Sequence, residues 1–368
     1  MKRVKVLYLV SNLRKTGPVL QLYNIVKYLD RNVFEPVILT ISPEDQNSVL
    51  SDFVQLQVPV ISLNWPKGSL PPKRIYFEKI KQISPTMLHS HGLRPDIIVK
   101  DLPSADYIRF TTIHCDPLED YPRLYGSRGF FAALMHIRTL RRIENRVACS
   151  KSLAEQLMRK YGLKASYVLN STDIKAKLEN IIASEQSIAM PRKKDDFVFI
   201  YVGELIKRKN LSFLLEAFKA LPNNIKLVVV GDGPERTKLE SRAPSNVIFV
   251  GRQENVASFL MNSDGYVSAS LSEGLPTAVL EALALGVPVL LSNIPAHAEI
   301  LSLAEQSGFR VGSLFRTSDL KDLLQKIRAF TIQDYNKLEI VEFFEAFFSP
   351  EKMSIGYQSL YLSSITER

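Results

Sequence analysis

Two carboxylates in one apolar segment are the strongest chemical signal in the sequence. Glu273 and Glu281 are separated by seven residues within SEGLPTAVLEALALGVPV, residues 272–289. A proline near the start of this segment and a glycine near its end predict a helix over about residues 276–285. Because most other side chains of this helix are apolar, an ionised Glu281 is costly there unless it has partners.

Two interpretations of this pair remain open at this stage. In the first, Glu273 caps the helix start, where free backbone amides and the helix dipole favour an anion, and Glu281 forms a salt bridge with a neighbouring element. In the second, both carboxylates serve a ligand. The second interpretation has support from the position of the segment, because it follows a short strand, and α/β sheets bind ligands at the carboxyl ends of their strands.

Other residues with chemical potential also follow apolar runs. The stretch VGELIKRKN places Arg208 and Lys209 after a predicted strand. The basic triplet KRK that contains them is either a phosphate-binding group or a solvated loop. His114 in TTIHCDP follows another strand and is either a core or loop residue or a ligand-binding one. His89 and His91 in HSHG share one strand face, but no third ligand is evident, so we predict no metal site.

The elements that position these residues form an α/β pattern. Short, fully apolar runs such as VKVLYLV, FEPVILTI and IRFTTIH alternate with helical patterns, which predicts parallel sheets covered on both faces in a doubly wound fold. The pattern loosens after VLNSTD and restarts with FVFIYVGEL, which indicates a domain boundary near residues 175–195. In the first crossover, Gly17 forms the turn and Pro18 occupies the first helical position. Two further helices, broken around Ser349 and Pro350, are predicted at the end.

Charge and cysteine content narrow the functional classes. The net charge is +9, and residues 1–170 contain 25 Lys and Arg against 14 Asp and Glu, a balance of +11. This half is either a solvated surface or a site for phosphates or anionic lipid headgroups. The apolar runs are too short for a transmembrane helix. Cys115 and Cys149 lack metal-ligand or C-x-x-C spacing, which is typical of a reducing cytoplasm, although one bridge stays open.

Several ordered motifs together resemble one family. HSHG, TTIHCDP, ACSKSLAEQL, VLNSTD, VGELIKRKN, VVVGDGPE, FVGR and the acid pair occur in the order and at the separations of the retaining glycosyltransferases with an E-x7-E motif, glycosyltransferase family 4. The resemblance extends to bacterial capsular and surface polysaccharide enzymes. It implies a GT-B fold, in which two Rossmann-like domains face an interdomain cleft. The acceptor-side domain would comprise residues 1–175 and returning terminal helices at about 346–368, and the donor domain residues 190–345.

The resemblance also implies roles for single residues. Glu281 would accept hydrogen bonds from the ribose of the donor, and Glu273 would face hydroxyls of the donor sugar. Lys209 and Arg208 would stabilise the departing nucleoside diphosphate, and His114 would lie near the transferred sugar. The diphosphate would be held by Gly17 and by the helix start, Gly274, Leu275, Pro276, Thr277, Ala278 and Val279.

Three departures from the family pattern limit these assignments. Glu204 stands where the family commonly has an arginine directly after the glycine, so Arg208 would supply that charge from a different position. Pro18 replaces a frequent second glycine and has no amide hydrogen to donate. NSTD replaces the usual NG-x-D, which weakens any role for Ser171, and Asp116 beside His114 is a less secure candidate.

The implied activity is transfer of a sugar from a nucleotide-sugar donor, a UDP-sugar being favoured, to a saccharide or lipid-linked acceptor in surface polysaccharide or glycolipid biosynthesis. It would be retaining, metal-independent and without a cofactor, with front-face attack. The alternatives are a GT-B nucleotide-sugar epimerase and a catalytically silent binding subunit. No nucleic-acid-binding module is evident.

A basic aromatic segment at residues 120–146 completes the candidates. Four apolar residues, Phe130, Phe131, Leu134 and Met135, precede Arg138, Arg141 and Arg142. Such a helix either lies on an anionic membrane surface or is a plain core helix with an arginine face. With the first interpretation we expect a cytoplasmic protein that associates peripherally with the inner face of the cell membrane.

Overall fold

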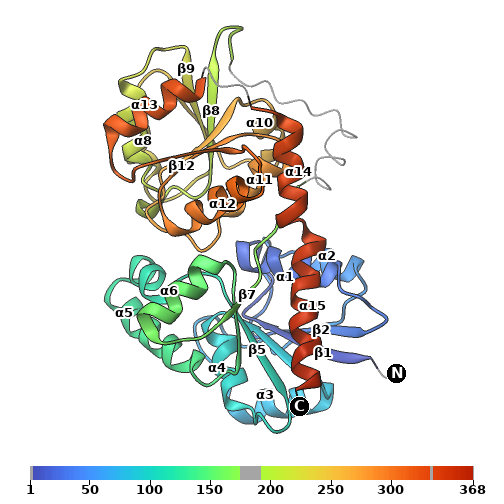
Figure 1. Ribbon diagram of the computed structural model, residues 1–368. Coiled ribbons are helices and arrows are strands. Elements are labelled where there is room, and N and C mark those ends of the chain that lie inside the picture. Colours follow the sequence, from blue (N-terminus) through green and yellow to red (C-terminus); the bar gives the residue numbers. More distant parts are fainter. Residues whose placement is uncertain (1–2, 175–191, 332–334, 368) are drawn as a thin grey trace. The chain divides into compact units, whose positions relative to one another are not determined.

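The computed structural model describes residues 3–174, 192–331 and 335–367. The chain divides into two compact units, the first comprising Met1–Ser171 with Pro350–Arg368 and the second Thr172–Ser349 (Figure 1). The first unit is therefore built from two separate stretches of the chain. Each unit has its own sheet and its own core.

The first unit contains a seven-stranded sheet in the order β3-β2-β1-β4-β5-β6-β7. Every pair of neighbouring strands is parallel, so all carboxyl ends lie at one edge of the sheet. This confirms the predicted doubly wound pattern. The strands are β1 (Val4–Val10), β2 (Phe34–Thr40), β3 (Val60–Ser62), β4 (Met87–His91), β5 (Ile108–Ile113), β6 (Asn145–Ala148) and β7 (Ser166–Tyr167).

Seven helices accompany this sheet in the described part of the first unit. The first begins at Gly17, one residue before the predicted start at Pro18, with Thr16 as N-cap, and α5 is interrupted by the non-helical backbone of Gly126. The helices are α1 (Gly17–Lys27), α2 (Leu50–Gln55), α3 (Lys73–Ile83), α4 (Leu93–Asp101), α5 (Pro117–Leu140), α6 (Lys151–Tyr161) and α15 (Pro350–Thr366).

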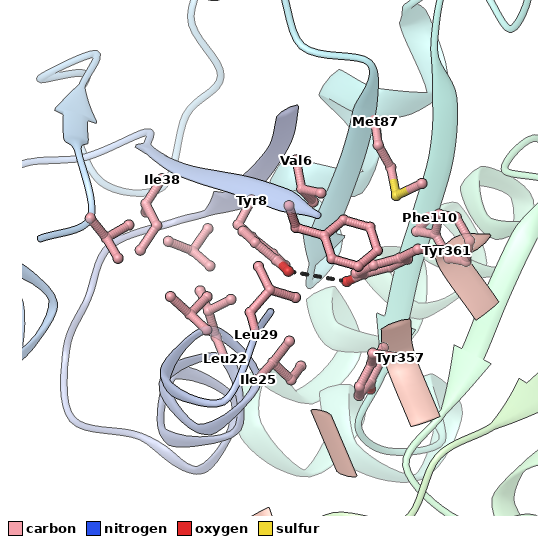
Figure 2. Close-up of a cluster of buried hydrophobic side chains, with 14 of the residues drawn as sticks. Val6, Tyr8, Leu22, Ile25, Leu29, Ile38, Met87, Phe110, Tyr357 and Tyr361 are labelled. Atoms are coloured by element: carbon pink, nitrogen blue, oxygen red, sulfur yellow. Dashed lines mark hydrogen bonds between the residues drawn. The ribbon is translucent and has the colours of Figure 1, made fainter. Parts of the chain in front are cut away.

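The last helix, α15, is part of the core of the first unit. It packs against α1, and Ser354 Oγ donates a hydrogen bond to Ile25 O at 2.8 Å. Figure 2 shows Tyr361 pointing from α15 toward Tyr8 of β1, and its hydroxyl donates to that of Tyr8 at 3.3 Å. Both tyrosines are fully buried. The returning helix thus covers part of one face of the sheet and excludes solvent from it.

The second unit contains a six-stranded parallel sheet in the order β10-β9-β8-β11-β12-β13. Strand β8 lies in the middle and begins the new pattern that the sequence predicted there. The strands are β8 (Phe197–Val202), β9 (Ile225–Val230), β10 (Val247–Gly251), β11 (Gly265–Ser268), β12 (Val289–Ser292) and β13 (Gly312–Phe315).

The described helices of the second unit include the predicted acid-bearing helix, which is α11. Its cap is Pro276, so the helix starts one residue later than expected and ends within one residue of the predicted end. The unit contains the 3-10 turn η1 (Lys207–Lys209), α8 (Leu211–Lys219), α9 (Arg236–Glu240), α10 (Val256–Met261), α11 (Thr277–Ala284), α12 (Pro295–Gln306), α13 (Leu320–Thr331) and α14 (Lys337–Phe348).

One expectation about the chain end needs correction. We expected both terminal helices to pack on the first domain, but α14 packs against α11 in the second unit, and only α15 belongs to the first. The break between them at Ser349 is where the chain leaves one unit for the other. The aromatic face of α14, including Phe343 and Phe344, is buried in the second unit because α11 presents an apolar side there.

A helix spans a membrane only if it is long and apolar enough. Among the residues that the structure describes, none of the helices is both long enough and apolar enough to cross a bilayer.

The end of α11 depends on Gly286. Its φ is +71°, and the amides of Gly286 and Val287 donate to Leu283 O and Ala282 O, which closes the helix. A Cβ at Gly286 would lie 2.9 Å from Lys337 O at the start of α14. The glycine is therefore required both for the left-handed backbone and for the close approach of α14.

We predict that Gly286→Ala destabilises the second unit more than Gly308→Ala does. Gly308 also has a positive φ, +80°, but a Cβ there meets nothing within 4 Å, so its cost is limited to about 1–2 kcal/mol for the left-handed backbone. Gly286→Ala adds an overpacking cost of about 1–3 kcal/mol. Urea unfolding of both variants measures the difference, and equal losses would contradict the contact with α14.

Candidate functional site

The acid-bearing loop joins β11 to α11 at the carboxyl edge of the second sheet. Strand β11 is fully buried, and the chain then runs through Glu273 to the helix start at Thr277. Gly274, Leu275, Pro276 and Val279 are buried, whereas Thr277 and Ala278 are half-buried. The structure thus places the predicted diphosphate-binding residues at a helix start that follows a parallel strand.

Glu273 is clamped by two cations. Arg208 Nη1 donates to Glu273 Oε2 at 2.6 Å, and Lys209 Nζ donates to Oε1, also at 2.6 Å. Arg208 Nη1 additionally donates to Ser272 O, and the amide of Leu271 donates to Arg208 O. The 3-10 turn η1 and the acid loop are therefore tied together by backbone and side-chain bonds.

The electrostatics of this clamp keep Glu273 ionised. Burial, with only 7% of the side chain exposed, would raise the pKa of Glu273, but Lys209 and Arg208 outweigh it and lower that pKa from 4.5 to about 2. Two cations face one carboxylate, so this cluster of three side chains has a net charge of +1. A positive cluster at a helix start has the chemistry to bind an anion.

Glu281 lies on α11 and is half-buried. Burial raises the pKa of Tyr266 in β11, and the carboxylates of Glu273 and Glu281 raise it further. The structure brings Glu273, Arg208 and Lys209 into contact, which spacing alone did not establish, and Glu281 lies on the helix that follows their loop.

His297, which was not predicted from the sequence, lies on the helix that follows β12, the next strand of this sheet. It lies in the first turn of α12, is fully buried, and donates from Nδ1 to Ser292 O at 2.8 Å. Its Nε2 is enclosed and has no partner among the described residues. Burial lowers the pKa of His297 to about 4, although Glu273 opposes this effect. The available signal was a polar residue just after the carboxyl end of strand β12.

In the first unit, His114 follows β5 and is half-buried. His114 Nε2 lies 3.1 Å from Nδ1 of His91, which ends β4. His89 is bound within the core instead, to Tyr361 Oη at 2.5 Å and to Thr112 Oγ1 at 2.8 Å. No group of three or more His, Cys, Asp or Glu side chains in the described ranges is placed to hold a metal ion.

Asp116, a less secure candidate than His114, has structural partners. It caps α5 by accepting from the amide of Leu118 at 2.9 Å, and it accepts from Tyr161 Oη at 2.5 Å and Lys160 Nζ at 2.9 Å. These bonds hold α5 to α6. Ser171 similarly donates its amide to Gln21 Oε1 at 2.9 Å, which is a packing role.

The remaining predicted residues lie on surfaces of the first unit. Gly17 starts α1, is exposed, and has open space where a Cβ would stand. Arg138, Arg141 and Arg142 are exposed at and just after the end of α5. Apolar side chains of the same helix are also exposed, and Phe131 reaches 71%. The exposed apolar residues Phe130, Phe131, Leu134 and Met135 and the three arginines form what we call the α5 surface.

A second buried network was also missed. Asp96 of α4 is fully buried and accepts from Ser90 Oγ at 2.6 Å, Thr111 Oγ1 at 2.7 Å and His136 Nε2 at 2.6 Å. A further hydrogen bond of 2.8 Å joins His136 Nδ1 to Tyr121 Oη. An isolated aspartate in a helix pattern gives no sign of these partners, because they come from three other elements.

The clamp makes a testable prediction about pH. Because the pKa of Glu273 is depressed in the folded state, its stabilisation is present above pH 4.5 and is lost as the pH falls toward 2. We expect Glu273→Gln to cost on the order of 3 kcal/mol at neutral pH and progressively less at acid pH.

Urea unfolding of native protein and variant at several pH values measures this difference. Glu216→Gln, on the exposed side of α8, is the matched control and should show no such pH dependence. A Glu273→Gln effect that is constant from neutral pH to about pH 3 would contradict the depressed pKa.

Comparison with known proteins places these residues in context. Residues 184–340 match the family described as Glycosyl transferases group 1. A putative teichuronic acid biosynthesis glycosyltransferase, TuaC of Bacillus subtilis, is 30% identical over 59% of this chain, which spans 55% of that relative's length. The O-antigen biosynthesis glycosyltransferase WclY of Escherichia coli is 26% identical, with 97% of this chain and 98% of the relative covered.

A solved structure supports the fold over the whole chain. HepE of Anabaena in complex with UDP superposes with a TM-score of 0.75 at 14% identity, and the match covers 98% of this chain and all of HepE. At this identity the likeness concerns the fold. Residues 184–340 thus match the model of the group 1 glycosyl transferases, and the chain as a whole has the GT-B fold of its structural neighbours.

Proposed function

We propose that this protein is a retaining glycosyltransferase that transfers a sugar from a nucleotide-sugar donor to a saccharide or lipid-linked saccharide in surface polysaccharide or glycolipid biosynthesis. The observation that carries the proposal is the cluster of Glu273, Arg208 and Lys209 at the carboxyl edge of a parallel sheet, before the helix that carries Glu281. The family match of residues 184–340 and the polysaccharide functions named for the relatives support it.

In this proposal the second unit binds the donor. The cluster of Glu273, Arg208 and Lys209 holds two cations beside the start of α11, a place that suits a diphosphate. The residues at that start, Gly274 to Val279, approach the phosphates closely in this scheme. Glu281 on the rigid helix then accepts hydrogen bonds from ribose hydroxyls, and Glu273 from hydroxyls of the donor sugar.

Charge stabilisation is the main catalytic effect in this scheme. Negative charge develops on the departing diphosphate, and positive groups aimed at it lower the barrier. Lys209 and Arg208 are held by Glu273 before the donor arrives, so little reorganisation is needed. We propose metal-independent front-face attack, in which the leaving phosphate takes the proton of the acceptor hydroxyl and His114 lies near the transferred sugar.

The donor is proposed to be a UDP-sugar. The support is the solved structure of HepE, which contains UDP and shares the fold. The acceptor is assigned to the first unit. The α5 surface combines exposed Phe131 and Phe130 with three arginines, a composition suited to the interface of an anionic membrane. We therefore propose a cytoplasmic enzyme that binds the inner face of the membrane peripherally.

The donor assignment is tested by nucleotide-induced thermal stabilisation. UDP, GDP, ADP, CMP and TDP are compared on the native chain, on Glu281→Ala and on the exposed control Glu216→Ala. A nucleotide at one hundred times its Kd should stabilise the native chain by about 2.7 kcal/mol. We expect UDP to do so, the control to retain the effect, and Glu281→Ala to weaken binding roughly tenfold or more, as loss of a charged hydrogen bond does.

Failure of every nucleotide to bind at saturation would contradict the donor assignment and favour a silent binding subunit. Equal binding by Glu281→Ala would contradict the ribose role. If the sugar of a bound sugar nucleotide is altered in the absence of any acceptor saccharide, the protein would instead be an epimerase.

The membrane assignment is tested by sedimentation with vesicles that contain anionic lipid. Neutralising Arg138, Arg141 and Arg142 to glutamine should reduce bound protein roughly tenfold or more, because each basic residue near such a surface contributes about 1 kcal/mol. Neutralising Lys15, Lys81 and Arg159, which are exposed elsewhere on the same unit, should have a smaller effect. Equal losses in both triple variants would show that only net charge matters, and unchanged binding would exclude the α5 surface.

A further inference from the structure

Two histidines at neighbouring strand ends of the first unit are linked directly. His91 ends β4 and His114 follows β5, and these strands are adjacent and parallel. His91 Nδ1 lies 3.1 Å from His114 Nε2, and the ring centroids are 5.4 Å apart at an angle of 25°. One of these nitrogens must carry the proton of the bond, and this choice decides what His114 offers to a ligand.

The surroundings keep both rings neutral and fixed. His89 stacks on His91 with centroids 4.6 Å apart and is anchored to Tyr361 and Thr112. Burial lowers the pKa of His91, and it lowers that of His114 to about 4 although the Asp96 carboxylate opposes it. At neutral pH each imidazole therefore carries one proton. The hydrogen bond between the rings contains one of these two protons.

The other nitrogen of His91 distinguishes the two possible arrangements. His91 Nε2 is enclosed and has no hydrogen-bond partner in the described part of the chain. If His114 donated the shared bond, His91 would carry its proton on Nε2 as a buried donor without an acceptor. If His91 donates, Nε2 is a buried lone pair instead, and unpaired acceptors are less rare inside proteins than unpaired N–H groups.

The second nitrogen of His114 is the one available to a ligand. His114 Nδ1 has no partner among the described residues and, unlike His91 Nε2, is not enclosed. We propose that His91 is a positioning residue that donates to His114 Nε2, and so fixes His114 as the Nδ1–H tautomer, a neutral donor to an oxygen of the transferred saccharide. The identity of the ligand as a saccharide rests on the proposed function, whereas the tautomer does not.

A neutral donor suits glycosyl transfer. Positive charge develops at the sugar ring in the transition state of such reactions, so an imidazolium at this place would oppose it. An uncharged N–H still orients a sugar hydroxyl or ring oxygen by hydrogen bonding. His91 thereby fixes the orientation of the His114 ring and the nitrogen that carries its proton, without contacting the ligand itself.

Long-range proton–nitrogen NMR of protein labelled in histidine tests this assignment without any substrate. The chain contains five histidines, His89, His91, His114, His136 and His297, so each ring is assigned by single substitution. We expect His114 in the native protein to carry its proton on Nδ1. We also compare His91→Asn, whose amide nitrogen occupies the place of Nδ1 and still donates, with His91→Leu, which has a similar size and no donor.

The expected result is the native His114 tautomer in His91→Asn and a mixed or Nε2-protonated His114 in His91→Leu. Unchanged signals of His136 and His297 show that each variant is folded. A native His114 protonated on Nε2, or a His91→Leu variant that keeps the Nδ1–H tautomer, would overturn the proposal. The native spectrum alone decides the tautomer where the leucine variant does not fold, and failure of nucleotide binding would leave this result unaffected.

Discussion

The buried clamp of Glu273 between Arg208 and Lys209 is the interaction on which the account depends. Two donor–acceptor distances of 2.6 Å tie the 3-10 turn after β8 to the loop after β11. Without the carboxylate, two half-buried cations would repel one another, and without the cations a buried carboxylate would lack compensation. The clamp therefore fixes two loops of the sheet edge and holds two cations beside the start of α11.

The clamp is positioned by ordinary packing. Strands β8 and β11 are neighbours in the sheet, so the loops that follow them meet at the same edge. Helix α11 is held at its far end by Gly286, where the close approach of α14 excludes a side chain. Packing of α14 on α11 thus connects the position of Glu281 to the hydrophobic core of the second unit, and the aromatic residues of α14 have a role in the site through this contact.

Much of this arrangement was predictable from local sequence. Apolar runs located the strands, and Pro276 and Gly286 bounded α11 within a residue, because both effects are properties of the local backbone. The partner of α14 was not predictable, because the apolar face of an amphipathic helix indicates that the helix is packed but does not indicate against which element. The clamp, the His91–His114 bond and the isolation of His297 Nε2 join residues from separate elements, and the spacing of one sequence contains no information about their distances.

The most direct measurement is calorimetric titration of the protein with UDP and, separately, with uridine, using the native chain and the double variant Arg208→Met with Lys209→Met. If the two cations bind the diphosphate, the double variant should lose UDP affinity by about 100-fold, as two charged hydrogen bonds do, and uridine affinity should be unchanged. An unaltered UDP affinity in a folded double variant would contradict the central claim that the two cations of the clamp bind the diphosphate.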